Sequence, residues 1–288
     1  EKVFNVVNIV IMLILLCLFL FPVFNVVSIS LSDDKAVLAA EVTFYPIGYN
    51  PQAYTAIFGN TDLWRAAFNS FYVAIIGCVL GLIGTCVAAY PMAYGNFYGK
   101  KLYVIIIMFT MWFNAGIVPL FLTIRQLGLY DSLWALILNS MITAYNVVII
   151  RSYFSSIPFS VIESARIDGA TDYRILFQLV IPLSKPVLAT VALWLIVGHW
   201  NDYLNPLVLI HSQEHKTLQL FLKELVLNAE TSTSNLASVN DATNKGVAAL
   251  SQQLKNGVLV VSMVPMLVLY PFLQKFFVSG VMLGSVKG

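Results

Sequence analysis

The chain has 288 residues, of which 59% are hydrophobic and only 10% carry a charge. Because roughly a quarter of the residues of a soluble domain are charged, this composition excludes an ordinary soluble protein and predicts one that resides in a lipid bilayer. The formal net charge of +2 is too small to indicate a nucleic-acid-binding protein. All three cysteines lie in apolar runs, which predicts packing roles and neither a disulfide framework nor a metal cluster.

Six apolar runs are long enough to cross a membrane, for which a helix needs about 20 mostly apolar residues. We expect spans over residues 6–29, 68–92, 102–124, 133–153, 186–210 and 257–278. The first run is too long for a secretory signal and lacks a small-residue cleavage site, so we interpret it as a true span. Gly77 and Gly81 in the second run are spaced as GxxxG, a pattern that lets another helix approach closely, and we expect packing within the chain there.

The distribution of lysine and arginine predicts that both termini are cytoplasmic. Basic residues gather in the segments after the second, fourth and sixth spans: Lys100, Lys101, Arg151, Arg166, Arg174, Lys185, Lys275 and Lys287. The short loop between the third and fourth spans holds only Arg125. We therefore expect one transmembrane domain over residues 1–288, with segment 158–182 and tail 279–288 in the cytoplasm and loop 211–256 outside.

The polar, small-residue segment between the fourth and fifth spans predicts two short helices at the membrane surface. Pro158 and Ser160 suggest a helix start, and Ser160 with Glu163 fits a capping box, in which each side chain bonds the other residue's amide. Gly169 should end this helix, and Thr171 is placed as the N-cap of the next one. From composition alone, such a segment is either a docking element for another protein or an amphipathic linker.

Pro182 and Pro186 should then end the second helix and direct the chain back into the membrane. The matching residues of a known signature run through the segment: Glu163, Ala165, Gly169, Leu179, Ile181 and Pro182. This pattern resembles the EAA signature of the inner-membrane permeases of ABC importers, with Ser164 where the signature usually has another small residue, alanine. The resemblance covers nearly the whole chain.

The resemblance is nearest to the carbohydrate-uptake class, namely maltose-transporter-like second permeases and LplC-like oligosaccharide permeases. WNDYLNPL at 200–207 and GVMLGSVKG at 280–288 support that subclass. It implies an all-α type I ABC importer permease with six transmembrane helices and cytoplasmic coupling helices. It also implies that the residues coupled to an ATPase subunit are Glu163, Ser164, Ala165, Asp168, Gly169 and Pro182.

The same resemblance implies the protein's partners. They are a second, homologous permease in a heterodimer, two ATPase subunits, an extracytoplasmic sugar-binding protein and an oligosaccharide substrate, in a bacterial cytoplasmic membrane. ATP and Mg would be bound by the ATPase subunits, so this chain would be non-catalytic and hold no cofactor of its own. Loop residues 231–245 would help to release the sugar from the binding protein, and tail residues 284–288 would reach the ATPase interface.

Polar side chains inside the predicted spans are candidates for the substrate path, because such groups are costly in a bilayer and often functional. The main cluster lies in the fifth span and consists of His199, Trp200, Asn201 and Asp202. Weaker candidates lie in the third and fourth spans: Trp112, Asn114, Tyr145 and Asn146. The cluster offers the aromatic faces and hydrogen-bonding groups that bind sugars. A structural network between helices, or a position near the outer interface, remains the alternative.

Motifs for chemistry within the chain are missing. The sequence contains neither a GxxxxGK[ST] phosphate loop nor HExxH, and His211 and His215 have no evident third metal ligand. Two other functions stay open: an ABC permease for another class of solute, and a proton-coupled secondary transporter that uses Asp202 and His199. A membrane-bound enzyme is disfavoured, because no set of catalytic side chains converges.

Overall fold

The computed structural model describes residues 2–113, 115–236, 250–268 and 270–271. Over these residues the chain is almost entirely α-helical, and its only strand-like pairing is an isolated antiparallel bridge between Ser32 and Tyr49. Two of the described helices, α1 (Lys2–Leu31) and α4 (Thr61–Tyr94), are each long and apolar enough to cross a membrane. The number rises to five if each of three bent helix pairs counts as one span.

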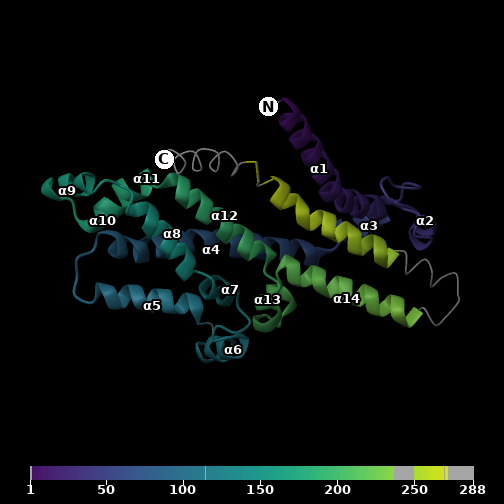
Figure 1. Cartoon of the computed structure of the whole chain (residues 1–288). Helices are drawn as coiled ribbons and strands as arrows, with labels where there is room; N and C mark the ends of the chain where they lie inside the picture. Colours follow the sequence, from purple (N-terminus) through teal and green to yellow (C-terminus); the bar gives the residue numbers. More distant parts are fainter. Residues whose placement is uncertain (1, 114, 237–249, 269, 272–288) are drawn as a thin grey trace. The chain divides into compact units, whose positions relative to one another are not determined.

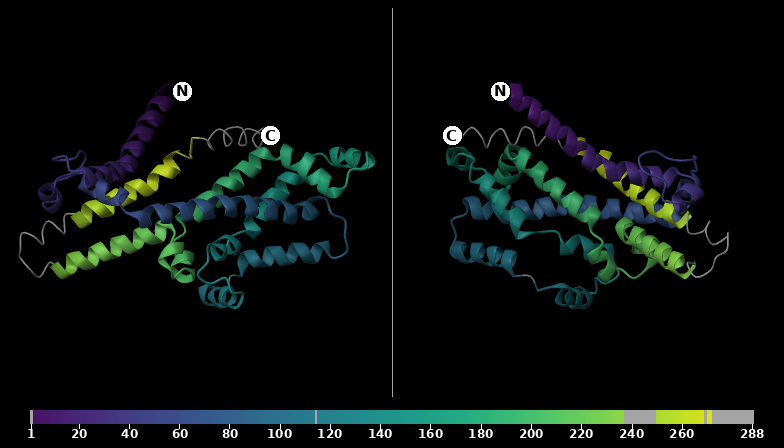
Figure 2. Two further views of the ribbon diagram at one scale, coloured as in Figure 1. Left: turned by 180° about the vertical axis from the view of Figure 1, so that it is seen from behind. Right: turned by 45° about the vertical axis from the view of Figure 1, so that its right-hand side comes forward.

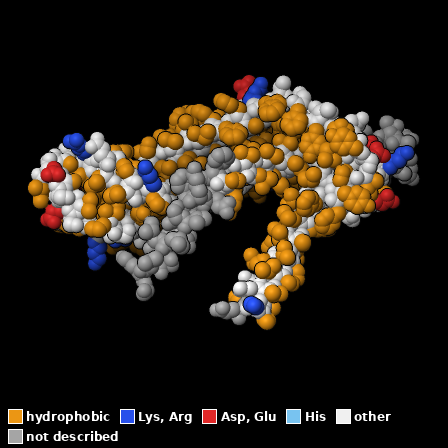
Figure 3. Space-filling view, turned by 90° about the horizontal axis from the view of Figure 1, so that it is seen from above, with side chains coloured by type: hydrophobic (Ala, Val, Ile, Leu, Met, Phe, Trp, Pro, Cys, Tyr) orange, Lys and Arg blue, Asp and Glu red, His pale blue; other side chains and the backbone are white. Residues whose placement is uncertain are grey.

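The chain divides into two compact units. Unit 1 comprises Glu1–Arg65 and Leu218–Met266, and unit 2 comprises Ala66–Thr217 and Leu267–Gly288. The surface of the molecule in Figure 3 is mostly hydrophobic, and charged side chains gather in a few small groups. Most side chains of α1 are exposed although nearly all are apolar, as expected for a helix that faces lipid or another membrane subunit.

Unit 1 holds α1, the short helices α2 (Asp34–Leu38) and α3 (Gln52–Phe58), and the longer helix α14 (Leu218–Leu236). It also holds residues 250–266 of a final helix that is described over residues 250–268. The final helix is tied to the segment after α1, because the buried Gln253 amide donates to the Ser32 carbonyl (2.7 Å) and to Asp34 (2.9 Å). It lies beside α14 in both views of Figure 2. Phe221 of α14 and Val258 of the final helix line one apolar pocket.

The expected outer loop 211–256 is therefore not simply a loop. Its residues 218–236 form α14, and Leu218, Phe221 and Leu222, spaced at i, i+3 and i+4, give that helix one buried apolar face. The expected sixth span, 257–278, begins inside the final helix and continues beyond the described residues.

Unit 2 contains most of α4 and a series of shorter helices, shown in Figure 1. They are α5 (Lys100–Trp112), α6 (Ile117–Gln126), α7 (Leu133–Asn139), α8 (Ala144–Phe154), α9 (Phe159–Ile167), α10 (Asp172–Ile175), a π-helical turn (Leu176–Val180), α11 (Ile181–Leu183), α12 (Lys185–Asn201), α13 (Leu204–Leu209) and a 3-10 turn (Gln213–His215). In Figure 1, α9 and α10 lie at the same end of unit 2 as the loop that joins α4 to α5.

Three spans that we expected to be continuous helices are broken, and each break has a local cause. The third divides into α5 and α6 because Phe113 is extended and Gly116 adopts φ +84°, a backbone conformation that favours glycine. The fourth divides into α7 and α8, bent by 49°, where Thr143 caps α8 by accepting from the Asn146 amide. The fifth ends at Asn201, because Asp202 leaves the helical conformation.

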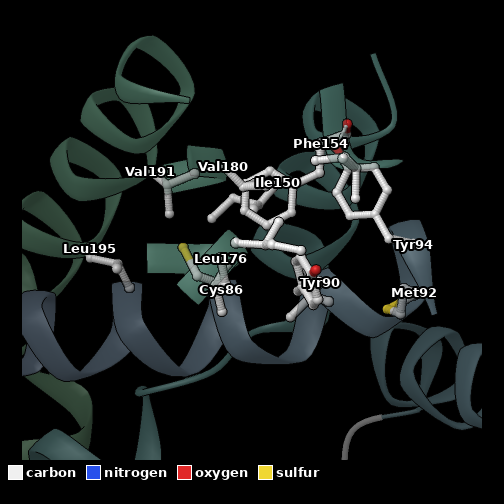
Figure 4. Packing of buried hydrophobic residues seen from close by; sticks show 14 of the residues in the cluster. Cys86, Tyr90, Met92, Tyr94, Ile150, Phe154, Leu176, Val180, Val191 and Leu195 are labelled. Carbon is white, nitrogen blue, oxygen red and sulfur yellow. Dashed lines mark hydrogen bonds between the residues drawn. The ribbon is translucent and has the colours of Figure 1, made fainter. Parts of the chain in front are cut away.

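One hydrophobic core joins α4, α8, α9, the π-helical turn and α12 (Figure 4). Its fully buried members include Ile150, Phe154, Ile162 and Val180. Glycines on α4 allow the close approach that the GxxxG pattern predicted. A Cβ at Gly81 would come within 2.9 Å of the Met141 carbonyl oxygen and 3.0 Å of Leu195. The expected packing within the chain is thereby confirmed.

Candidate functional site

The first candidate region is the coupling segment, residues 158–182. Its helix α9 begins directly after Pro158, whose φ of −55° and ψ of 129° precede the first helical residue, Phe159. Ser160 is already inside the helix, and no side chain caps its N-terminus. The predicted capping box between Ser160 and Glu163 is therefore wrong: proline with its fixed φ starts the helix one position earlier than expected.

The end of α9 follows the prediction. Gly169 has φ +80°, its amide donates to the Arg166 carbonyl (3.0 Å), and the Ala170 amide donates to the Ala165 carbonyl (3.0 Å). Such a left-handed residue closes a helix by satisfying its last carbonyl groups. Thr171 then caps α10 by accepting from the Arg174 amide, as expected.

One face of α9 is anchored and the other is free. Ile162 is completely buried in the core, and Ala165 is half-buried against it. The side chains on the other face, and Pro182 farther along, are exposed: Glu163, Ser164, Asp168 and the apolar Ile167, which is 81% exposed. A short helix held by one face presents the other to a protein that has a matching groove.

An ion pair within the coupling segment, which we did not predict, is linked by a hydrogen bond to α4. The Asp172 Oδ1 atom accepts a hydrogen bond from Arg166 Nη2 of α9 (3.0 Å) and another from the Tyr90 hydroxyl of α4 (3.0 Å). The hydrogen bond from Arg166, joined by that from Tyr90, holds the pKa of Asp172 below its usual value even though partial burial opposes the shift. The same hydrogen bond to Asp172 raises the pKa of Arg166.

Beside the ion pair lies a cavity of about 560 Å³, whose lining includes Tyr90, Phe97, Arg166, Asp172 and Tyr173. The charged ends of the pair thus face open space on one side. The chain next bends by 85° at Ser184, between the stretch Asp172–Leu183 and α12. The expectation that Pro182 ends the helix is wrong, because Pro182 lies inside α11, and Pro186 lies in the first turn of α12, where proline is well tolerated.

The second candidate region is a pocket of about 510 Å³ between the α7–α8 break, α8 and the C-terminal end of α12. We call it the α8–α12 pocket. Its lining residues are Ser140, Thr143, Tyr145, Asn146, Trp194, Leu195, Gly198, His199, Asn201, Asp202 and Asn205. The rings of Tyr145 and Trp194 lie 5.6 Å apart with a tilt of 39° and form an aromatic wall.

Polar groups of the α8–α12 pocket are arranged by the end of α12. The Asp202 carboxylate accepts from the Asn205 amide (3.1 Å) and from Asn205 Nδ2 (2.7 Å), so it caps α13. Asp202 is consequently half-buried at a helix break, not enclosed within a continuous span as we expected. His199 is buried, its Nε2 has no hydrogen-bond partner in the described part of the chain, and its ring lies against Gly77 of α4.

Comparison with known proteins assigns the chain to a family. The profile described as "Binding-protein-dependent transport system inner membrane component" matches residues 77–239, which include both candidate regions. The chain belongs to this family. The polygalacturonan/rhamnogalacturonan transport system permease protein YtcP of Bacillus subtilis (strain 168) is 33% identical to this inner membrane component, over 93% of this chain and 92% of its own length.

Protein LplC of Bacillus subtilis (strain 168) is 32% identical over 100% of this inner membrane component and 96% of its own length. A chain in a crystal structure of a bacterial ABC transporter involved in the import of the acidic polysaccharide alginate is 32% identical. It matches with a TM-score of 0.85 over 96% of this chain and 97% of that chain. The expected all-α permease fold is thereby confirmed.

The α8–α12 pocket brings together five of the predicted path residues of this inner membrane component: Tyr145, Asn146, His199, Asn201 and Asp202. Two others lie elsewhere. Trp200 is buried and packs edge-on against Phe71, with ring centroids 5.1 Å apart, and Trp112 is 80% exposed at the end of α5. Asn114 lies outside the described residues. Trp194 was not predicted as a path residue. A tryptophan in an apolar run is as typical of a lipid-facing position as of a binding pocket.

Near the end of unit 2 that holds α13, Asp131 fastens the α6–α7 connection to the segment after α13. Its Oδ1 accepts from the His211 and Ser212 amides (2.9 Å each) and from the Ser212 hydroxyl (3.1 Å). Burial alone would raise the pKa of Asp131, but these hydrogen bonds, with help from His215, outweigh it and lower the pKa. The described residues hold no group of three or more side chains suited to a metal ion.

Proposed function

We propose that this chain is a permease subunit of a binding-protein-dependent ABC importer that translocates oligosaccharides. Separate ATPase subunits bind α9 and drive transport by ATP hydrolysis. The observation that carries the proposal is the geometry of α9. In this short helix Ile162 is buried in the permease core, and the side chains of Glu163, Ser164 and Asp168 are exposed on its outer face.

The mechanical logic follows from rigidity. Packed cores transmit displacement because they are dense and resist compression. A partner that closes on ATP and displaces α9 would therefore displace the core around Phe154, Val180 and Val191, to which α9 is joined through Ile162. Alternating access then results from rocking of the packed helices about a central binding region.

The α8–α12 pocket has the chemistry of a sugar path. Aromatic faces from Tyr145 and Trp194 cover the apolar side of a pyranose ring, and Asn146 and Asn201 supply hydrogen bonds to its hydroxyl groups. Asp202 is the only acid among the lining residues, and none of them is lysine or arginine.

The relatives support an oligosaccharide substrate, since YtcP is named for transport of polygalacturonan and rhamnogalacturonan. By the same proposal the partners are a second permease, two ATPase subunits and an extracytoplasmic sugar-binding protein. Both termini are cytoplasmic, the chain itself is non-catalytic, and it needs no cofactor of its own. Of the segments given further roles, residues 237–245 and the tail 279–288 lie outside the described residues.

Transport by the complete complex in proteoliposomes tests the proposal. We would load a panel of neutral and uronate oligosaccharides of matched length and measure both uptake and ATP hydrolysis. Glu163→Ala should lower the sugar transported per ATP hydrolysed. Glu214→Ala removes the same charge from an exposed acid outside the coupling segment and should not lower it. Equal ratios for the two variants would contradict the assignment of α9.

A different result would favour a secondary transporter. Uptake by this chain alone, driven by a proton gradient without ATPase subunits and lost in Asp202→Asn or His199→Gln, would replace the ABC proposal. Proteoliposomes with the complete complex and proteoliposomes with this chain alone therefore separate the two mechanisms.

A further inference from the structure

The way in which α9 is held suggests a role for a residue outside the EAA signature. We propose that Asp172 is a positioning residue for energy coupling: its carboxylate fixes the orientation of α9 relative to α4, so that displacement of α9 is passed to the spans without loss. This inference rests on the proposed function, because it assumes that α9 receives the motion of the ATPase subunits.

The backbone alone does not hold α9 at a fixed angle. Directly after the helix, Gly169 is in the left-handed conformation with open space around it, because an added Cβ would meet nothing within 4 Å. Only Ala170 and Thr171 separate it from α10. Such a connection serves readily as a hinge, since a few residues at the end of an element absorb changes in backbone angles.

Packing holds the other side of α9, but it is not directional. Ile162 and Ala165 contact the core through apolar surfaces, and the hydrophobic attraction between such surfaces is non-directional. The hydrogen bonds of Asp172 are directional, and they join three elements through one oxygen atom: α9 by Arg166, α10 by Asp172 itself and α4 by Tyr90. The side chains of Arg166 and Asp172 are 39% and 61% exposed, so solvent weakens their charge attraction and the contact acts mainly through its geometry.

The cavity beside the pair supports this interpretation. Tyr90, Arg166 and Asp172 all line the 560 Å³ cavity, so no tightly packed wall keeps the Arg166 side chain in place from that side. Figure 4 shows Tyr90 on α4 among the buried core residues, which places one end of the connection on a rigid element. The position of Arg166 therefore depends on its hydrogen bond to Asp172. The pair fixes the angle between α9 and α10 across the Gly169 connection.

The test measures the ratio of sugar transported to ATP hydrolysed in proteoliposomes containing the complete complex. This ratio does not depend on how much of the complex is folded, so a merely structural role would leave it unchanged. Asp172→Asn keeps the size of the side chain but removes its charge. We expect it to lower the ratio by about two- to thirtyfold, the range for loss of one contact that contributes to coupling.

Two matched pairs of variants identify the contact. Tyr90→Phe and Tyr94→Phe each remove one hydrogen-bonding hydroxyl from the end of α4, but the Tyr94 hydroxyl donates to the Phe154 carbonyl of α8. Only Tyr90→Phe should lower the ratio. Arg166→Gln should lower it, whereas Arg174→Gln removes an equal charge whose partner is Gln178 and should not.

The controls also separate this inference from the proposed function. If Glu163→Ala lowers the ratio and Asp172→Asn does not, the role of Asp172 is overturned and the proposed function stands. If Tyr94→Phe lowers the ratio as much as Tyr90→Phe, the role of Asp172 is likewise overturned. If neither Glu163→Ala nor any variant of the pair changes the ratio, α9 is not the coupling helix and both proposals fail.

Discussion

Replacement of Gly169 tests how far coupling depends on the closed end of α9. At φ +80° an L-residue costs about 1–2 kcal/mol, and alanine regains about 0.4–1 kcal/mol by restricting the unfolded chain. Nothing lies within 4 Å of the added Cβ, so no steric term is added. The net cost of Gly169→Ala is about 1 kcal/mol, which lowers the ratio of closed to open α9 about fivefold, since a factor of ten corresponds to about 1.4 kcal/mol.

Gly169→Pro should be far more severe. Proline fixes φ near −65°, and it removes the amide that donates to the Arg166 carbonyl at 3.0 Å, at a cost of about 3 kcal/mol or more. Hydrogen exchange of the α9 amides and the transport-to-hydrolysis ratio measure both effects. Gly99→Ala is the matched control, because Gly99 has φ +89° and equally open surroundings at the start of α5. Full coupling in Gly169→Pro, or equal loss in Gly99→Ala, would refute the reasoning.

Three further predictions concern unit 2. Trp194→Ala should slow uptake roughly two- to tenfold, because it removes an aromatic contact of the α8–α12 pocket that is worth about 0.5–1.5 kcal/mol. Basal ATP hydrolysis should stay unchanged. Unaltered uptake would exclude this aromatic wall from the sugar path. Gly77→Ala should lower the melting temperature of the purified complex, because the added Cβ would overlap the His199 ring and overpacking costs about 1–3 kcal/mol. Gly198→Ala is the control: nothing lies within 4 Å of its added Cβ, so it should not lower the melting temperature. Because the folded-state pKa of Asp131 is lowered, its stabilising contribution should be complete above its ordinary pKa of 3.8 and disappear as the pH falls through the folded-state value. Asp131→Asn should remove that acid-dependent step from the melting temperature, and an unchanged acid profile would contradict it.

Features of the fold that follow from short-range rules could be predicted from the sequence. The apolar runs located the helices, and Gly169 and Thr171 ended one short helix and began the next where their conformational preferences required. The breaks within the spans were missed, because hydropathy averaged over a window does not detect the residues that cap or end a helix inside an apolar run. Thr143 and Asp202 are residue types that favour helix N-termini, so each carried a signal within its apolar run.

The composition of the site was harder to predict, because it depends on contacts between distant segments. Tyr145 and Trp194 meet only after the α7–α8 break and α12 come together. The link from Tyr90 to Asp172 joins residues 82 positions apart, which no local spacing rule covers. The signature residues of α9 predict where a partner binds, but the residues proposed to orient α9 are visible only in the folded chain.

The helix α12 connects the two candidate regions of unit 2. It starts at the 85° bend after the coupling segment, and its last turn carries His199 and Asn201 into the α8–α12 pocket. Its 17 residues span about 25 Å at 1.5 Å per residue. Val191 and Leu195 fasten its middle to α4, and Leu195 belongs to both the core and the pocket lining. Because the middle of α12 is packed against α4, motion at the bend reaches the pocket end only if the two helices move as one packed body. At the break, Asp202 is the C-cap residue of α12 and its carboxylate accepts from Asn205 of α13, so the start of α13 is tied to the pocket end of α12.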